Sequence, residues 1–118
     1  MPLDVAPQFL EEKSENIRLC IQCKGGVLDG KKFELQGELF IGRQPGRCQI
    51  CYPSDTAGIS GLHCQLRKVG GTLELTDLGS SYGTFTKDGK LTPNVPVLLH
   101  PGDTFWLADP INTFIVYR

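Results

Sequence analysis

Apolar and polar residues alternate in short runs along most of the chain, which is the period of a half-buried β-strand. In residues 17–23, for example, every second position is an apolar residue or a cysteine. Glycine pairs, Asp-Gly steps and prolines separate these runs, and the sequence shows no long stretch with a helical period and caps. The pattern therefore predicts an all-β chain built from short strands.

Roughly ten short strands are expected at this spacing, which is typical of a β-sandwich or a closed barrel. They include residues 17–23, 32–35, 38–41, 62–69, 72–76, 84–86, 95–98, 104–107 and 114–117. The clearest hairpin signal is Gly70-Gly71, because a two-residue turn between strands favours glycine at positive φ. We expect an antiparallel β-sandwich.

Three stretches depart from the strand pattern, namely residues 42–47, 53–61 and 78–83. Two of them contain four of the five serines in the chain, and the first contains Arg43. Hydroxyl groups, backbone N–H groups freed by glycine and an arginine are suitable donors for a phosphate group. Because loops on a rigid scaffold commonly carry function, we look for a binding site there first.

Length and charge restrict the possible functions. The chain has 118 residues and a formal net charge of -1, which fits one domain and offers no broad basic surface for nucleic acid or an anionic membrane. Residues 1–16 hold two prolines and four acidic residues against one lysine, so we expect a flexible acidic N-terminal tail before a domain at 17–118. The start of the chain lacks the basic region of a signal peptide, so we expect a cytoplasmic protein.

The order of three motifs in these loops is more specific than any one of them. They are Gly42-Arg43, then Ser60-Gly61-Leu62-His63, then Ser81-Tyr82-Gly83-Thr84. From about residue 17 to its end, the chain resembles the forkhead-associated (FHA) domain family, which carries a Gly-Arg, a Ser-x-x-His and an Asn-Gly-Thr in this order. The resemblance implies a sandwich of about eleven strands, similar to SMAD and FHA domains, with recognition loops at one end.

The resemblance also implies a function, which is the binding of phosphothreonine peptides. Arg43 would pair with the phosphate, and Ser60 and Ser81 would donate their hydroxyl groups to it. A supporting role in loop geometry is implied for four further residues: Gly42, His63, Gly83 and Thr84. The implied partner is a protein phosphorylated on threonine, which links the domain to a Ser/Thr protein kinase, and neither a cofactor nor a metal is implied.

Two positions depart from the family pattern. Gly61 stands where the family often has arginine or asparagine, which removes one possible donor to the phosphopeptide. Tyr82 stands where the family has asparagine, and a phenol cannot both donate to and accept from a peptide backbone as a carboxamide does. An FHA fold that acts as a phosphate-independent protein-interaction scaffold is therefore the alternative, and it predicts that charge reversal at Arg43 leaves partner binding unchanged.

Four of the five cysteines raise a third hypothesis, because Cys20/Cys23 and Cys48/Cys51 form two C-x2-C pairs separated by 24 residues. That spacing is close to the spacing of a four-thiolate zinc site. In the β interpretation, however, Cys20 and Cys23 share one strand and face opposite sides of it. We therefore favour free cysteines that pack in the core or at the surface.

Catalytic chemistry finds little support in the sequence. His63 and Cys64 are adjacent on an expected strand, which points their side chains apart. No nucleophile elbow or P-loop is present, and Asp77 is interpreted as a turn residue that accepts from nearby backbone amides. We expect a binding module with no catalytic residues rather than an enzyme.

Overall fold

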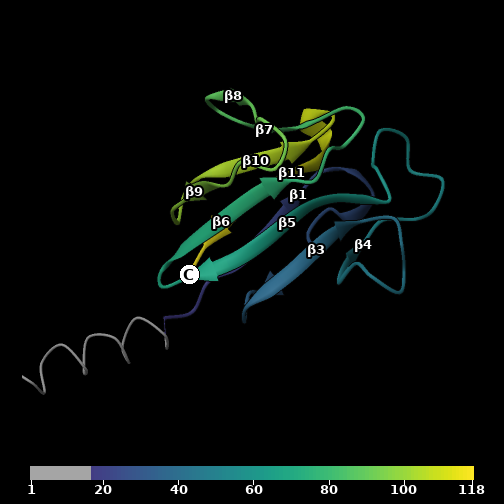
Figure 1. The fold of residues 1–118 in the computed structure, drawn as a ribbon. Coiled ribbons are helices and arrows are strands. Elements are labelled where there is room, and N and C mark those ends of the chain that lie inside the picture. The colour runs from purple at the N-terminus through teal and green to yellow at the C-terminus, as the bar shows by residue number, and fades with distance from the viewer. Residues whose placement is uncertain (1–16) are drawn as a thin grey trace, which may run out of the picture.

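The computed structural model describes residues 17–118, and the predicted acidic tail lies outside the described residues. The described part contains eleven β-strands and two short 3-10 turns, η1 (Gly26–Leu28) and η2 (Pro110–Asn112). Figure 1 shows the strands in two layers that face each other. Among the described residues, no helix is both long and apolar enough to span a membrane.

The first sheet has six strands. Their order is β2 (Lys32–Glu34), β1 (Cys20–Lys24), β11 (Thr113–Tyr117), β10 (Thr104–Leu107), β7 (Thr84–Thr86) and β8 (Gly89–Lys90). The second sheet has five, in the order β4 (Ile50–Cys51), β3 (Glu38–Gly42), β5 (Leu62–Val69), β6 (Thr72–Asp77) and β9 (Val97–Leu99). All paired neighbours are antiparallel except β3 and β4, which are parallel. The predicted β-sandwich is confirmed.

The core lies between the two sheets and is filled by alternate residues of the strands. In β6, Leu73 and Leu75 are fully buried, whereas Glu74 between them is only half-buried. The rings of Phe105 and Phe114, on paired strands β10 and β11, stack with their centroids 5.2 Å apart. Each large apolar side chain buried in this way contributes about 1.5–3 kcal/mol, so the alternation in the sequence is the main source of the fold.

Strand boundaries differ from the sequence prediction in a few places. β9 begins at Val97 rather than at residue 95, because Pro96 has no N–H to donate to a ladder. The strands β4 and β8 have two residues each, which is too short to produce a visible alternation. The β5–β6 hairpin was predicted correctly, with Val69 paired to Thr72 and Gly70 at a φ of 62°.

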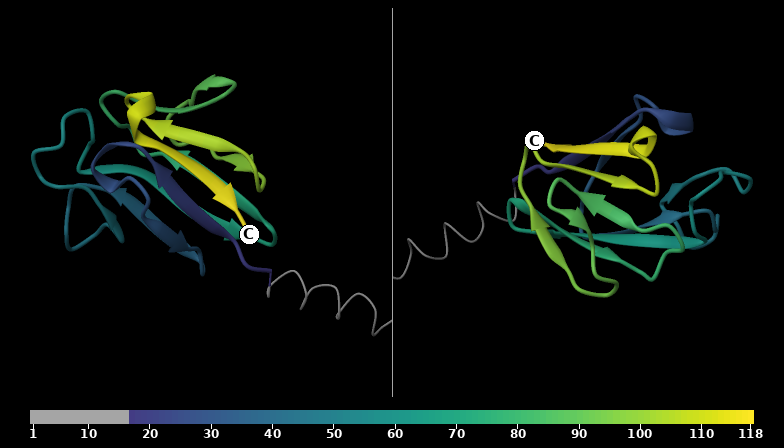
Figure 2. Two further views of the ribbon diagram at one scale, coloured as in Figure 1. Left: turned by 180° about the vertical axis from the view of Figure 1, so that it is seen from behind. Right: turned by 90° about the horizontal axis from the view of Figure 1, so that it is seen from above.

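Strand register brings three loops together at one end of the sandwich. Gly42, the last residue of β3, pairs with Leu62, the first residue of β5, and Cys64 pairs with Asp77 at the end of β6. The loops of residues 43–49, 52–61 and 78–83 therefore start from neighbouring strand ends. Figure 2 shows them together at the end opposite the C-terminus. We call this the loop end.

Candidate functional site

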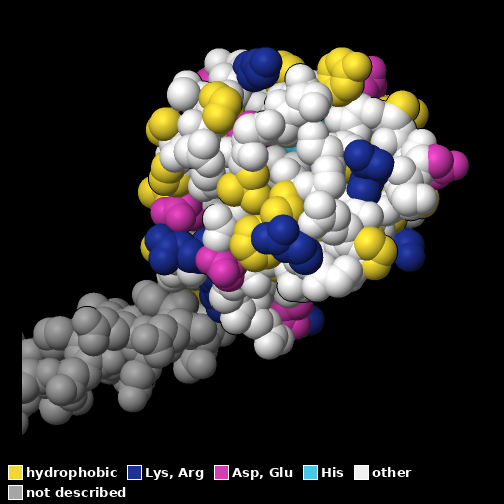
Figure 3. All heavy atoms as spheres, turned by 45° about the vertical axis from the view of Figure 1, so that its right-hand side comes forward, with side chains coloured by type: hydrophobic (Ala, Val, Ile, Leu, Met, Phe, Trp, Pro, Cys, Tyr) yellow, Lys and Arg dark blue, Asp and Glu magenta, His cyan; other side chains and the backbone are white. Residues whose placement is uncertain are grey.

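The loops at the loop end surround a hollow of about 270 Å³, which we call the loop hollow. Its lining includes Arg43, Ser54, Asp55, Ser60, Ser81 and Tyr82. The sequence predicts five phosphopeptide-binding residues. Four of them, Arg43, Ser60, Ser81 and Tyr82, line this hollow, whereas the fifth, Gly61, is not part of its lining. In Figure 3, which brings the loop end forward, basic side chains are scattered among uncharged and acidic ones and form no continuous basic patch.

Arg43 is fixed by the loop that it faces. Its Nε donates to the carbonyl of Ile59, and one terminal nitrogen donates to the carbonyl of Ser54 at 2.7 Å. These bonds connect the end of β3 to both sides of the β4–β5 loop. Arg43 is half-buried, and a guanidinium has five N–H groups, so three remain for a ligand while the two bonds fix the plane of the group.

Ser60 and Ser81 are joined directly. The backbone N–H of Ser81 donates to Oγ of Ser60 at 3.0 Å, which connects the β4–β5 loop to the β6–β7 loop. A hydroxyl that accepts from one neighbour keeps its own proton for a different acceptor. Ser60 can therefore donate to an anion in the loop hollow, and the exposed Ser81 side chain stands beside it.

His63 connects the same two loops from inside the domain. Its Nδ1 accepts from the backbone N–H of Ser60 at 3.0 Å, and its Nε2 lies 2.9 Å from the carbonyl oxygen of Gly83. Because that carbonyl can only accept, Nε2 carries the proton and the ring is neutral. His63 is fully buried, and this burial lowers its pKa. Of the described residues that line the loop hollow, the ring forms a hydrogen bond only with Ser60.

Asp77 organises the β6–β7 loop and is itself buried. Its Oδ2 accepts from the backbone N–H groups of Gly79 and Ser80 at 3.0 and 3.1 Å, which confirms the turn role expected of it. Its Oδ1 accepts from the hydroxyl groups of Ser80 and Thr84 at 2.5 and 2.7 Å. Ser80 Oγ in turn accepts from the N–H of Gly83 at 3.0 Å. The loop that carries Ser81 and Tyr82 is thus held by one buried carboxylate.

With this geometry established, comparison with known proteins decides the family. A family model described as "FHA domain" matches residues 39–108, which is more than half of the chain. The chain belongs to the FHA domain family. A search of curated proteins finds no sequence match.

Solved structures show the same fold. One, from a "structural and functional analysis of phosphothreonine-dependent FHA domain interactions", is 26% identical, with a TM-score of 0.70 over 86% of this chain and 97% of that chain. An FHA domain of an Arabidopsis thaliana hypothetical protein is 26% identical, with a TM-score of 0.75 over 87% of this chain and 86% of that one. The FhaA FHA domain complexed with the intracellular domain of Rv3910 is 27% identical, with a TM-score of 0.67 over 83% of this chain and 98% of that chain.

The two glycines beside Arg43 in this FHA domain make a close backbone contact. A Cβ on Gly42 would lie 2.1 Å from the carbonyl oxygen of Gly61, so only glycine fits there. That same oxygen accepts from the N–H of Arg43 at 2.9 Å and from the thiol of Cys48 at 3.3 Å. At Gly61, by contrast, a Cβ would meet only the end of the flexible Gln44 side chain.

The remaining predicted residues of the site lie in the β6–β7 loop and at the start of β7. Gly83 has a φ of 93°, and its carbonyl oxygen accepts from the N–H of Ala108 as well as from His63. Thr84 is buried and donates to Asp77. Tyr82 is 66% exposed and lines the loop hollow.

Two acidic residues at the loop end were not predicted as site residues from the sequence. Asp55 lines the loop hollow and is exposed, and Asp109 follows β10 nearby. Neither belongs to a motif that marks a site, because their position depends on how the loops fold together. Asp55 places a negative charge close to Arg43, which opposes the binding of an anion and leaves Arg43 as the main source of attraction.

The cysteines make local contacts. The thiol of Cys23 donates to the carbonyl of Gly25 at 3.3 Å, and the thiol of Cys48 donates to that of Gly61. All five thiols are free, and among residues 17–118 no three His, Cys, Asp or Glu side chains gather as metal ligands would. Four of the five are buried, Cys23 and Cys64 completely so in the core, and Cys51 is half-buried.

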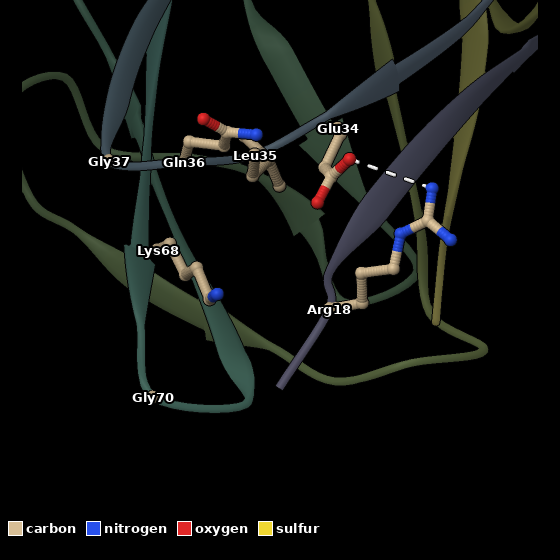
Figure 4. A pocket seen from close by; sticks show the side chains of 7 residues that line it. All are labelled: Arg18, Glu34, Leu35, Gln36, Gly37, Lys68 and Gly70. Carbon is tan, nitrogen blue, oxygen red and sulfur yellow. Dashed lines mark ion pairs between the residues drawn. The ribbon is translucent and has the colours of Figure 1, made fainter. Parts of the chain in front are cut away.

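A second polar hollow, of about 430 Å³, lies at the opposite end of β5, between the β2–β3 and β5–β6 turns. Figure 4 shows Arg18 and Glu34 joined there by an ion pair of 3.5 Å, with Lys68 on the second sheet. None of its described lining residues is a serine or threonine. Its arginine forms an ion pair with a carboxylate, whereas Arg43 forms no ion pair among the described residues and is fixed by two carbonyls, so the loop hollow is the better anion site.

Proposed function

We propose that this FHA domain binds a segment of a partner protein that is phosphorylated on threonine, with the phosphate in the loop hollow. The observation that carries the proposal is the fixed guanidinium of Arg43, held by the carbonyls of Ile59 and Ser54 beside the free hydroxyl protons of two serines. Hydrogen bonds from a charged donor to a phosphate are about twice as strong as neutral ones.

Threonine is favoured over serine by the small apolar surface in the hollow. Ile59 is buried and lines it, so the γ-methyl group of a phosphothreonine has a contact that phosphoserine lacks. Burial of one methyl group contributes about 0.8 kcal/mol, or roughly fourfold in affinity. Larger discrimination would come from the fixed geometry of the β4–β5 and β6–β7 loops.

The domain would thereby connect a Ser/Thr protein kinase to the protein that this kinase phosphorylates. One of its structural relatives was described through phosphothreonine-dependent interactions, and another was solved with the intracellular domain of a partner. The five free thiols fit a reducing compartment such as the cytoplasm. Such a module needs neither a cofactor nor a catalytic residue, because recognition depends on charge-assisted hydrogen bonds and a small apolar contact.

The test is a binding titration with a phosphothreonine peptide library and its unphosphorylated counterpart. We expect binding only to the phosphorylated library, and a roughly 10- to 100-fold loss on Arg43→Ala, since a hydrogen bond to a charged group contributes about 1.5–3 kcal/mol. Arg67→Ala is the matched control, because Arg67 is exposed on β5 and pairs with Glu74 at 3.1 Å.

Because Arg43 also holds the β4–β5 loop, Ser60→Ala is the second variant, which leaves both bonds of Arg43 in place. We expect it to weaken phosphopeptide binding without lowering the melting temperature by more than a few degrees. Equal binding of both libraries, unchanged by Arg43→Ala, would contradict the proposal and would support the phosphate-independent scaffold instead.

A further inference from the structure

A second hollow adjoins the loop hollow, and the phosphate site proposed above does not use it. This hollow, of about 340 Å³, is lined by Ala57, Gly58, Tyr82, Ala108 and Asp109, and we call it the alanine hollow. Gly58 and Tyr82 line both hollows, so the two are direct neighbours. A peptide with its phosphate in one can therefore place a nearby side chain in the other.

The walls of the alanine hollow are held by backbone contacts. Ala108 has a φ of 65°, which is uncommon for a residue other than glycine, and its N–H donates to the carbonyl of Gly83 at 2.9 Å. A Cβ on Gly58 would lie 3.0 Å from the Cβ of Ala108. The β4–β5 loop and the turn after β10 are therefore in close contact, and the hollow has a defined shape.

The chemistry of the lining points to a basic side chain. Two alanine methyl groups provide an apolar surface, and the exposed ring of Tyr82 provides an aromatic face. The carboxylate of Asp109 is oriented by the backbone N–H of Ile111, which donates to Oδ1 at 2.9 Å. Among the described residues, Asp109 forms no ion pair with a lysine, arginine or histidine.

Lysine and arginine match all three parts of this lining. Their aliphatic stems pack on apolar surface, while the charged end interacts with a carboxylate or with the face of an aromatic ring. An aliphatic residue would make no use of the negative charge of Asp109, and an acidic residue would be repelled by it. Arg43 and the alanine hollow thus present opposite charges to the two parts of one ligand.

We propose that the alanine hollow selects a lysine or arginine close to the phosphothreonine in the partner. The inference rests on the proposed function, because it takes the phosphate to be in the loop hollow. Because the two hollows share Gly58 and Tyr82, and one residue of extended chain spans about 3.5 Å, the basic residue would stand within a few positions of the phosphothreonine. The recognised sequence is therefore phosphothreonine with a nearby basic residue.

The experiment uses phosphothreonine peptides that differ at one flanking position, with lysine, arginine, leucine or glutamate in turn at each position. Affinities are measured for the unaltered chain and for Asp109→Asn, with Asp88→Asn as control, since Asp88 is an exposed aspartate in the β7–β8 turn. At one flanking position we expect about a fivefold preference for lysine or arginine over leucine. Asp109→Asn should reduce this preference to less than twofold, whereas Asp88→Asn should retain it.

A second variant, Tyr82→Leu, tests the aromatic face separately, and its readout is the ratio between basic and leucine peptides. We expect that ratio to fall, whatever the change in overall affinity at this residue of the loop hollow lining. Phosphate-dependent binding without a basic preference, or with a preference that Asp109→Asn does not change, would overturn the inference and leave the proposed function intact. Loss of all phosphate dependence would instead overturn the proposed function, and the inference with it.

Discussion

At the scale of single residues, Gly42 and Gly61 face each other across the base of the Arg43 loop, but they respond differently to substitution. The backbone of Gly61 fills the space that a side chain on Gly42 would need. The space beside Gly61 is limited only by the end of Gln44, which can move. Packing therefore requires glycine at position 42. At position 61 it does not, and glycine there supplies no side-chain donor for a ligand.

We therefore predict that Gly61→Asn strengthens phosphopeptide binding by roughly three- to tenfold, because the new carboxamide can donate to the ligand from beside Ser60. Isothermal titration calorimetry of both proteins measures the change. Gly42→Ala is the comparison, and we expect it to lower the melting temperature sharply, since its methyl group overlaps a backbone carbonyl. An affinity unchanged by Gly61→Asn would show that position 61 lies out of reach of the ligand.

The motifs in the sequence identified Arg43, Ser60, Ser81 and Tyr82, and the structure gathers them around one hollow. Residues whose role depends on contacts made in the folded loops could not be predicted from these motifs. Ser80 was not singled out, because nothing in its neighbours shows that its hydroxyl joins Asp77 to Gly83. Such contacts depend on loop conformation, which no local pattern encodes.

At the scale of elements, the strands with clear alternation were predicted well and the shortest were not. Residues 62–69 and 72–76 were predicted as a hairpin, and β5 and β6 agree with this to within one residue. The parallel pairing of β3 with β4 was not predicted, because a two-residue strand such as β4 has no visible period. The register that brings the loops together is a tertiary property, so the sequence alone could not place the hollow.

The conformation of the β6–β7 loop depends on the hydrogen bonds to Asp77, so we predict that replacing this carboxylate destabilises the domain. All four groups that bond its carboxylate are donors, so in Asp77→Asn the new amide N–H₂ would face donors instead of an acceptor. We expect a loss of about 1–3 kcal/mol in the free energy of unfolding. Urea unfolding measures this, with the exposed Asp88→Asn as control. A change below about 0.5 kcal/mol would show that the network does not hold the loop.

At the scale of the whole molecule, His63 couples stability to pH because it connects two loops while buried. Its pKa in the folded state lies below the ordinary value of 6.5, so the unfolded state binds the proton more readily. Protonation would also place an N–H at Nδ1 against the N–H of Ser60. Stability is therefore complete above about pH 6.5 and falls as the pH drops below it.

We predict that the free energy of unfolding falls between pH 7 and pH 5, with a slope of at most about 1.4 kcal/mol per pH unit for this proton. Urea titrations at several pH values measure the slope. His63→Gln should lower the stability at pH 7 and flatten the dependence, whereas His100→Gln, at an exposed turn position, should leave it unchanged. A slope that persists in His63→Gln would assign the effect to other groups.

The most direct test of the central claim is a nuclear magnetic resonance titration of the domain with a phosphothreonine peptide, following backbone amides and the Arg43 Nε–H. We predict that the largest shifts fall on Arg43, Ser60 and Ser81. Signals of Gln36 and Lys68 at the other hollow should stay in place, and the unphosphorylated peptide should cause no shifts. Shifts centred on the other hollow, or equal shifts from both peptides, would contradict a phosphate site at the loop end.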